Sequence, residues 1–378
     1  MNMDSPVLRV LIAPDSFKGS LEAADVARYL AAGVRRALPS AVVDELPIAD
    51  GGEGTAAAIA AALGGSWREF TVTDGNGAPR KVAVAFCASD ALGDFAVFDM
   101  AQVAGLPDAV AAPDERTTAG IGELVRMLHD AGTGTIAIGL GGSATNDAGS
   151  GMLAELAYDF TDSAGHALRP VFGNLQQVAK VARRADALWL DLLTLIGLTD
   201  VTNPLSGPQG ASAVFGAQKG FQDLAGADAR LARLASRFDA DECAKRPGAG
   251  AAGGLGFGLA LLGAQLQSGA DFICQVTGVA ARIADYGWVL TGEGRSDVQT
   301  LMGKGPAAIA ALARGAGVPV TLVAGAIDAS PELDAAFDGC FSIAPGPVAL
   351  AYAMEHGAQL LEQAGYSLAK LFAHGPPR

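Results

Sequence analysis

The sequence predicts an α/β protein with a parallel sheet and a second α/β unit inserted into the first. Short apolar runs rich in Val, Ile and Leu alternate along the chain with segments of helical periodicity. This alternation is typical of βαβ units, in which helices cover a parallel sheet. The chain has 378 residues, 50% of them apolar, which is enough for two domains with a core each.

The N-terminal half supplies three β–α units. The run "VLRVLIAP" precedes an amphipathic helix from about Ser20 to Leu38, for which Ser20 is the expected N-cap. "VVDELPI" leads through "ADGGEGT" into the helix "TAAAIAAAL", and "TGTIAIGL" leads through "GGSATND" into "GSGMLAELAY". Between them, Thr117 or Thr118 caps a helix with one apolar face, formed by Ile121, Leu124, Val125 and Leu128.

The rest of the chain repeats this pattern around a less regular segment. Later strand-like runs are "ALWLDLLTLIGL", "YGWVL", "VPVTLVAGA" and "GCFSI", and a C-terminal helix begins near Val348. From about Ala78 to Pro170, the runs "RKVAVAFCAS" and "DFAVFDMA" lie close together, which predicts a meander or mixed sheet. With boundaries at "TDGNGAP" and near Asp285, we expect one domain over 1–77 plus 285–378 and an inserted α/β domain over 78–284.

The charge balance excludes several classes of partner. The chain has 26 Lys and Arg against 40 Asp and Glu, a net charge of −14. Nucleic acids and anionic membranes require clustered positive charge, so neither is expected. The four cysteines lack metal or disulfide spacing, and no apolar run reaches the roughly 18 residues of a membrane span. We expect a soluble, cytoplasmic protein, and the sequence leaves its oligomeric state open between monomer and homodimer.

Five polar or glycine-rich loops lie where a strand is followed by a helix. They are "APDSFKGSL" (13–21), "ADGGEGT" (49–55), "GLGGSATND" (139–147), "TDVTNPLSGPQG" (199–210) and "TGEGRSDVQTLMGKGP" (291–306). In open parallel sheets ligands bind beyond the carboxyl ends of the strands, and helix N-termini there attract anions. The charged residues of these loops are Asp15, Asp50, Glu53, Asp147, Asp200, Glu293, Asp297, Lys18, Arg295 and Lys304.

The residue types in these loops favour phosphoryl transfer. The loops contain no histidine and no cysteine, which argues against a Ser-His-Asp or Cys-His nucleophile. In phosphoryl transfer, by contrast, the protein mainly positions groups and neutralises charge: carboxylates hold Mg²⁺ and lysines meet phosphates. On a chain of net charge −14, an anionic ligand also needs local cations such as Lys18.

Any single loop also admits a simpler interpretation. Gly139, Gly141 and Ala144 fit G-x-G-x-x-A after a strand, with Asp159 about 20 residues farther on, as in a dinucleotide-binding loop. Glycines at such turns often only supply a positive φ, and an aspartate such as Asp147 can be an N-cap and nothing more.

Arg295 and Asp297 could likewise pair with each other. The occurrence of several such loops in one chain nevertheless favours a functional site.

Taken together, the motifs closely resemble the glycerate kinase family of bacterial glycerate metabolism, which is unrelated to protein kinases. The resemblance covers nearly the whole chain, from "APDSFKGSL" and "PIADGGEGT" through "GLGGSATND", "DVTNPLSGPQGASAVFGAQKG" and "PGAGAAGGLG" to "TGEGRSDVQT", "GKGP" and "FSIAPGPVAL". It implies ATP-dependent phosphorylation of D-glycerate to 2-phosphoglycerate, by in-line transfer with Mg²⁺. It also implies a discontinuous Rossmann- or flavodoxin-like domain with an inserted α/β domain, and a site in the cleft between them.

Carried over residue by residue, the resemblance assigns roles to particular positions. Catalytic roles fall to Asp15, Lys18, Asp200 and Asp297, with Asp200 first and Asp297 second as acceptor of the hydroxyl proton. Substrate or phosphate binding falls to Ser143, Asn146, Asp147, Arg295, Lys304, Gly141 and Gly142. Asp200 and Glu293 are the expected Mg²⁺ ligands. The residues alone do not fix whether O2 or O3 is phosphorylated.

Two rival classes make different predictions. A nicotinamide-dependent oxidoreductase that uses "GLGGSA" would bind NAD(H) tightly and show no kinase activity. A non-catalytic sensor of sugar acids or nucleotides would bind its ligand without turnover. The dense acidic and lysine-bearing loops argue against the sensor.

Overall fold

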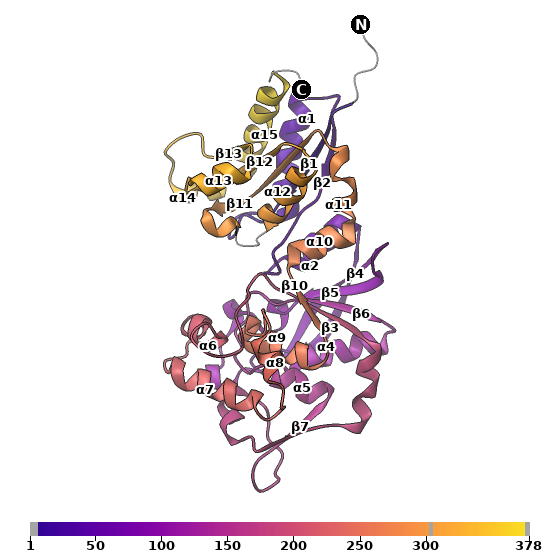
Figure 1. Cartoon of the computed structure of the whole chain (residues 1–378), viewed down its shortest axis with the longest axis vertical. Coiled ribbons are helices and arrows are strands. Elements are labelled where there is room, and N and C mark those ends of the chain that lie inside the picture. Colours follow the sequence, from indigo (N-terminus) through magenta and orange to yellow (C-terminus); the bar gives the residue numbers. More distant parts are fainter. Residues whose placement is uncertain (1–6, 302–304, 375–378) are drawn as a thin grey trace. The chain divides into compact units, whose positions relative to one another are not determined.

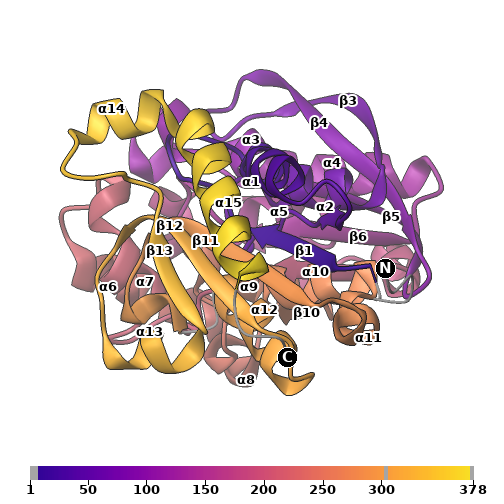
Figure 2. The same ribbon diagram turned by 90° about the horizontal axis from the view of Figure 1, so that it is seen from above.

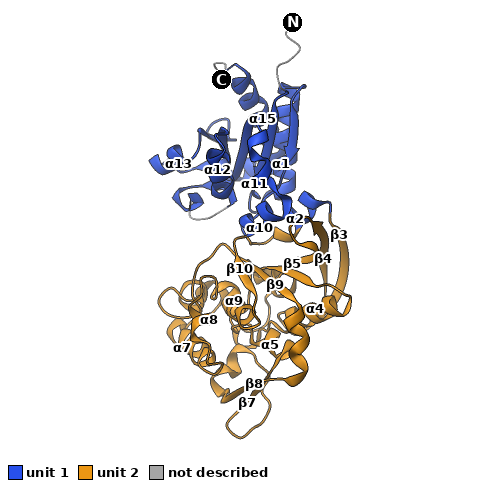
Figure 3. Ribbon diagram, turned by 45° about the vertical axis from the view of Figure 1, so that its right-hand side comes forward, with its two compact units in different colours: residues 1–50, 57–64, 269–378 blue, residues 51–56, 65–268 orange. Residues whose placement is uncertain are grey.

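A computed structural model describes residues 7–301 and 305–374, and the chain divides into two compact units (Figure 1, Figure 3). Unit 1 comprises residues 1–50, 57–64 and 269–378, and unit 2 comprises residues 51–56 and 65–268. Unit 1 is therefore discontinuous, and unit 2 occupies the middle of the chain. No helix within the described ranges is long and apolar enough to cross a membrane.

Both unit boundaries differ from those expected at 77/78 and 284/285. Residues 65–77 join unit 2 because strand β3 (Ser66–Thr73) pairs along its whole length with β4 (Pro79–Ser89). Residues 269–284 join unit 1, where helix α10 (Gly269–Thr277) packs against α12 (Gly305–Gly315). A sequence pattern marks where an element ends, but pairing across the sheet decides the unit to which it belongs.

Unit 1 is built on a five-stranded parallel sheet in the order β13-β12-β11-β1-β2. Counted within the unit, the order is 2-1-3-4-5, which reverses between β1 and β11. Its strands are continuous apolar runs because helices cover both faces. The strands are β1 (Arg9–Pro14), β2 (Val42–Glu45), β11 (Trp288–Ser296), β12 (Val320–Ile327) and β13 (Gly339–Ser342).

Two long helices cover one face of this sheet. Val10 and Ile12 of β1 share a buried cluster with residues of α1 (Ala23–Ala37) and α15 (Gly357–Ala373). Figure 2 shows α1 and α15 along one side of the strands, with α12 and α13 along the other. The remaining helices are α2 (Thr55–Leu63, which begins within residues 51–56 of unit 2), α11 (Val279–Arg282), α13 (Pro331–Ala336) and α14 (Leu350–Glu355).

Unit 2 contains a six-stranded mixed sheet in the order β10-β9-β6-β5-β4-β3. Strands β5, β6, β9 and β10 are parallel, while β4 pairs antiparallel with both β3 and β5, so the two runs for which a meander or mixed sheet was predicted, β4 and β5, are indeed paired in a mixed sheet. The other strands are β5 (Gly93–Asp99), β6 (Thr135–Gly139), β9 (Thr194–Leu198) and β10 (Gln265–Gln267), with a separate hairpin of β7 (Tyr158–Thr161) and β8 (Lys180–Arg183).

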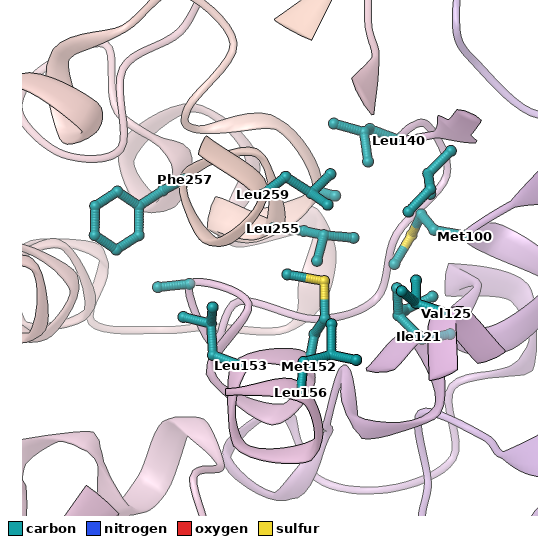
Figure 4. Close-up of a cluster of buried hydrophobic side chains, with 14 of the residues drawn as sticks. Met100, Ile121, Val125, Leu140, Met152, Leu153, Leu156, Leu255, Phe257 and Leu259 are labelled. Atoms are coloured by element: carbon teal, nitrogen blue, oxygen red, sulfur yellow. The ribbon is translucent and has the colours of Figure 1, made fainter. Parts of the chain in front are cut away.

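The helices of unit 2 enclose its core. The predicted apolar face of α4 (Ala119–Asp130) is fully buried, and it faces Met152 and Leu156 of α5 (Ser150–Leu156) in Figure 4. Leu255 and Leu259 of α9 close the same cluster. The helices not yet given are α3 (Ala101–Ala104), α6 (Ala211–Phe215), α7 (Leu224–Ala235), α8 (Asp241–Lys245) and α9 (Ala251–Leu261).

The first helix departs from the sequence expectation at its start. Ser20 is not an N-cap: α1 begins at Ala23, and Glu22 stands at the cap position without a side-chain hydrogen bond. Instead, Phe17 and Leu21 pair across a tight turn, and the Ser20 hydroxyl donates to the carbonyl of Met354. The loop after β1 is thus held as a turn of its own, separate from the helix.

Candidate active site

In unit 1, acidic side chains meet where the strand order reverses. Asp15 directly follows β1, and Glu293 lies near the carboxyl end of the neighbouring β11. The N–H of Asp15 donates to the carbonyl of Gly292 at 2.7 Å, which fixes the loop against β11. A point of strand reversal is where open α/β sheets bind their ligands, so the unit carries its polar groups where a site is expected.

The environment of Asp15 disfavours its ionised form. The residue is only 9% exposed, and its Oδ1 accepts a hydrogen bond from the Ser16 N–H at 2.6 Å. Burial, the nearby charge of Asp50 and, to a smaller extent, that of Glu293 raise the pKa of Asp15 to about 8, against the lowering effect of the Ser16 hydrogen bond. A carboxyl group that titrates near neutral pH is suited to accept or donate a proton during a reaction.

Glu293 is held by two hydroxyl groups. Its Oε1 accepts from Thr300 Oγ1 at 2.6 Å and from Ser296 Oγ at 3.3 Å, and all three residues are buried. Asp297, by contrast, caps the 3-10 turn Val298–Leu301: its Oδ1 accepts from the N–H of Gln299 at 2.7 Å. The hydrogen bond to the Gln299 N–H therefore accounts for Asp297 as a capping residue, without requiring a catalytic role.

The N-terminus of α12 approaches Asp15. A Cβ atom at Gly305 would lie 3.6 Å from Asp15 Oδ2 and 2.7 Å from Ile48 Cδ1, so a glycine allows the close approach. The positive end of this helix dipole is therefore next to the acidic cluster. Lys304, the predicted phosphate ligand just before the helix, lies outside the described residues.

Lys18 and Arg295, the two predicted cations of unit 1 that lie within the described residues, are exposed. Lys18 lies in the turn after β1. The backbone of this turn packs on β11, since a Cβ atom at Gly294 would be 3.3 Å from the backbone nitrogen of Lys18. Arg295 forms an ion pair with Asp328 at 2.7 Å. The pairing of Arg295 with Asp297 that the sequence allowed is thus replaced by one with the strand-end residue Asp328.

In unit 2, the loop after β6 is covered by the segment 51–56. The N–H of Gly141 donates to the carbonyl of Gly51 at 3.1 Å, and a Cβ atom at Gly141 would collide with the Cα of Gly52. The Gly141 N–H is therefore used in a hydrogen bond within the protein, and the part of Gly141 and Gly142 in phosphate binding stays a prediction. Gly142 is exposed, with φ +72°, and keeps the chain in its turn.

The same loop carries three predicted ligands, which differ in their environment. Asp147 is fully buried, and its carboxylate accepts from the Thr118 N–H and hydroxyl and from the N–H groups of Gly149 and Gly151. Burial raises the pKa of Asp147, although these four donors oppose the shift. The carboxylate ties the loop to the starts of α4 and α5, so Asp147 is suited to position the loop.

Asn146 and Ser143, unlike Asp147, keep hydrogen-bonding capacity that a ligand could use. Asn146 Nδ2 donates to Ser212 Oγ at 2.9 Å, while its Oδ1 and the neighbouring Thr145 Oγ1 are buried without a hydrogen-bond partner among the described residues. Because a hydroxyl can accept or donate, turning the Asn146 amide would only exchange the unpartnered atom. Buried polar atoms without partners are uncommon and occur where a ligand or water completes the structure.

Two buried cations hold this loop, and the sequence reasoning assigned neither a role. Lys219 is 4% exposed, and its Nζ donates to Ser143 Oγ and to the Thr145 carbonyl, each at 2.8 Å. Arg116 is 8% exposed and donates to the carbonyls of Lys219, at 2.7 Å, and Ala144, at 3.2 Å. The signal in the sequence was a lysine within the glycine-containing "FGAQKG", which gives no sign of the residues that it contacts.

Burial has a strong effect on Lys219. It lowers the pKa of the Lys219 ammonium to about 7; the charge of Asp147 opposes this shift and that of Arg116 adds to it. Burial likewise lowers the pKa of Arg116. A lysine whose charge is marginal at neutral pH is a common feature of functional sites.

The remaining predicted residue, Asp200, follows β9 in unit 2 and is half-buried. It lies at the carboxyl end of the sheet, as do the loops after β5 and β6. The glycine-rich stretch 248–256 lies close in space to the residue before Asp200, since a Cβ atom at Gly248 would be 3.1 Å from Thr199 Cγ2. It leads into α9, with positive φ at Ala252, Gly253 and Gly254. Gly253 accepts a hydrogen bond from the Ala148 N–H, so this kink supports the loop after β6.

The structure bears on the metal prediction only in part. Within the described ranges, no three His, Cys, Asp or Glu side chains are arranged to hold a metal ion. Asp200 belongs to unit 2 and Glu293 to unit 1, so their combination stays a prediction. Mg²⁺ is commonly held by one or two carboxylates together with phosphate oxygens, and these all-oxygen donors fit that cation.

The described residues around Asp15 in unit 1 and around the loop after β6 in unit 2 include carboxylates, hydroxyls and cations but no histidine or cysteine. These residue types are the ones that a small-molecule phosphotransferase uses. Comparisons with known proteins agree with this class. A family model described as the glycerate kinase family matches residues 10–373. The chain belongs to the glycerate kinase family and is an enzyme of that family.

Relatives match over nearly the whole chain. It is 38% identical over 373 residues to glycerate kinase of Bacillus subtilis (strain 168), covering 96% of this chain and 97% of the relative. It is 37% identical over 333 residues to glycerate 2-kinase of Escherichia coli (strain K12), covering 85% of this chain and 86% of the relative. The crystal structure of "putative glycerate kinase 2" from Salmonella typhimurium LT2 superposes with a TM-score of 0.84 at 34% identity, covering 98% of this chain and 99% of that chain.

Proposed function

We propose that the protein phosphorylates D-glycerate at O2 with ATP as phosphoryl donor, giving 2-phosphoglycerate and ADP. The observation that carries the proposal is the acidic cluster of Asp15 and Glu293 at the strand reversal of a glycerate kinase family member. Support for O2 comes from the relative described as glycerate 2-kinase. We also propose, from the strand order 2-1-3-4-5, that unit 1 is of the flavodoxin-like class.

Asp15 is the general base in this proposal. The O2 hydroxyl of glycerate attacks the γ-phosphorus of ATP in line, its proton passes to the Asp15 carboxylate, and the bond to the bridging oxygen of ADP breaks. A pKa of about 8 gives Asp15 a proton affinity suited to this step. Asp200 and Asp297, which the sequence ranked first and second, become second candidates because Asp297 caps a turn and the raised pKa favours Asp15.

Each unit offers cations or hydrogen-bond donors for an anionic group. Lys18, exposed after β1, meets the substrate carboxylate or the transferring phosphoryl group, and the N-terminus of α12 supplies a positive dipole end. Ser143 and Asn146 of unit 2 donate to a second anionic group. The location of the reaction in an interdomain cleft stays a prediction.

Mg²⁺ would be held by Glu293 and Asp200 together with phosphate oxygens, and it would neutralise charge on the transferring group. The buried hydroxyls of Thr300 and Ser296 orient the Glu293 carboxylate for such a role. Lys304 and Arg295 remain proposed phosphate ligands, and Arg295 must exchange its ion pair with Asp328 to take that part.

A coupled assay of ADP formation with D-glycerate and Mg·ATP tests the proposal. We expect wild-type turnover and a 2-phosphoglycerate signal by NMR, whereas 3-phosphoglycerate would overturn the O2 assignment alone. Tight NAD(H) binding without ADP formation would favour an oxidoreductase, and ligand binding without turnover would favour a sensor.

Single substitutions test the residue assignments. Asp15→Asn and Lys18→Ala should each lower kcat/KM by about 10²-fold or more, as expected for loss of a base or a charge clamp. Arg28→Ala is a matched control, because Arg28 is an exposed cation of unit 1 whose contacts, with Asp25 and the Tyr29 ring, are to neighbours on its own helix. Near wild-type kcat/KM in both test variants would remove these two residues from the mechanism.

A further inference from the structure

Lys219 is a buried lysine that joins distant parts of unit 2. It ends the 3-10 turn Ala217–Lys219, yet its Nζ reaches Ser143 Oγ and the Thr145 carbonyl in the loop after β6. Its own carbonyl accepts a hydrogen bond from Arg116, which also holds the Ala144 carbonyl. Lys219 and Arg116, both buried, thus donate hydrogen bonds to three consecutive residues of one loop, 143–145.

The hydrogen bond from Lys219 decides what the Ser143 hydroxyl can do. A serine hydroxyl has one donor hydrogen and two acceptor sites, whereas a lysine ammonium only donates. Ser143 Oγ accepts from Lys219, so its hydrogen must point to another acceptor. Ser143 donates to none of the described residues, although it is only 6% exposed. The arrangement therefore presents a hydroxyl donor with a cation directly behind it.

Packing alone does not account for a lysine at this position. Burial works against the ammonium charge, and an apolar side chain of similar length would avoid that penalty. The charged groups that face Lys219 are Asp147, which favours its charge, and Arg116, which opposes it. The next residues of the loop carry unpartnered buried polar atoms, Thr145 Oγ1 and Asn146 Oδ1. The region is thus polar, positive and incompletely hydrogen-bonded, as expected beside a bound anion.

We propose that Lys219 is a positioning residue for the kinase reaction: it orients the Ser143 hydroxyl to donate to an anionic oxygen, a carboxylate or a phosphate, of a bound substrate. This inference rests on the proposed function. The shared chemistry of carboxylate and phosphate leaves two sources, the sugar acid and the nucleotide. Because Lys219 acts through Ser143, removing either residue should weaken binding of the same ligand.

A double-mutant cycle of Lys219→Met, Ser143→Ala and the double variant tests the coupling. We expect each single variant to raise one KM about 10-fold or more, with a smaller change in kcat, because ground-state binding is lost. An increase in the KM for D-glycerate identifies the carboxylate, and an increase in the KM for ATP identifies a phosphate. The double variant should be no worse than Lys219→Met alone. Lys245→Met is the control, since Lys245 is exposed and pairs with Glu242 on α8.

Other outcomes would overturn the inference. If the effects of the two substitutions multiply, or if Ser143→Ala leaves both KM values unchanged, Lys219 does not act through Ser143. If the Lys219→Met protein does not fold, the Ser143→Ala variant and a Lys219→Arg variant still test the inference. Lys219→Arg keeps the positive charge, so it should retain part of the affinity for the ligand. If the wild type forms no ADP, the proposed function fails; calorimetric binding of D-glycerate and of ADP to wild type and Ser143→Ala then tests the positioning by itself.

Discussion

At the scale of single residues, the burial that gives Asp15 a raised pKa, and so suits it to proton transfer, also lowers the stability of the folded protein. Burial and neighbouring acids raise its pKa to about 8, well above the ordinary value of 3.8. Between these two values the folded protein keeps a proton that the unfolded chain has released. Stability therefore falls as pH rises from about 4 to 8, and above 8 the protein contains a buried, ionised carboxylate. Because the Asp15 carboxyl group lowers stability in this range, its presence is better explained by function than by the fold.

Asp15→Asn should accordingly stabilise the protein while it lowers activity. The amide cannot ionise, so we expect a gain of at least ~1 kcal/mol at pH 8, or about 2–4 °C in Tm for a unit of this size, and a smaller gain at pH 5. Scanning calorimetry at the two pH values, beside the ADP assay, measures both effects. An equal change in Tm at pH 5 and pH 8 would show that the Asp15 charge does not set the stability.

At the scale of elements, close helix packing in unit 1 depends on small residues. Gly33 of α1 lies against the backbone of α15: a Cβ atom there would collide with the carbonyl oxygen of Glu362 and lie 2.6 Å from the nitrogen of Tyr366. Gly365 of α15 meets the backbone of Leu30 in the same way. The two helices approach so closely because neither residue has a side chain at the contact.

Gly33→Val should therefore separate α1 from α15. Backbone atoms cannot move aside as a side-chain tip can, so we expect a loss of about 3 kcal/mol, or roughly 6–12 °C in Tm. Gly315→Ala is the control, because Gly315 ends α12 with nothing within 4 Å of its would-be Cβ. Equal Tm values for the two variants would contradict the close packing.

At the scale of the whole molecule, each unit has a core of its own. One buried cluster lies entirely within unit 1 and includes Val10, Leu30 and Trp288, and another lies within unit 2 and includes Phe98, Met152 and Leu255. Apolar burial is the main source of stability, so separate cores favour separate unfolding.

We expect calorimetry of the wild type to resolve two transitions. Gly33→Val should lower only the transition of unit 1. Asp147→Ala should lower only that of unit 2, by about 2–5 kcal/mol, because it leaves the buried donors of Thr118 and Gly151 without an acceptor. A single transition that both variants shift equally would show that the two units unfold as one.

Much of the architecture follows from local patterns. The strands of unit 1 are continuous apolar runs, the helix over Thr55–Leu63 is an alanine-rich segment, and the apolar face of α4 follows a 3.6-residue period, all of which the sequence displays directly. The unit boundaries were less accurate, since the pairing of β3 with β4 joins segments that composition separates. Ser20 fits the usual N-cap residue types, but a contact with Met354 places it in a turn.

The chain by itself determined the β–α order, the acidic and lysine-bearing loops at strand ends, and the resemblance that the family match confirmed. These features depend on residue types at short spacing, which a sequence shows. Only the tertiary structure brought Asp15 beside Glu293, assigned Asp147 to internal hydrogen bonds, and placed Lys219 behind Ser143, 76 residues away. The physical reason is that burial and charge interactions act through space, between residues whose distance along the chain gives no sign of their contact.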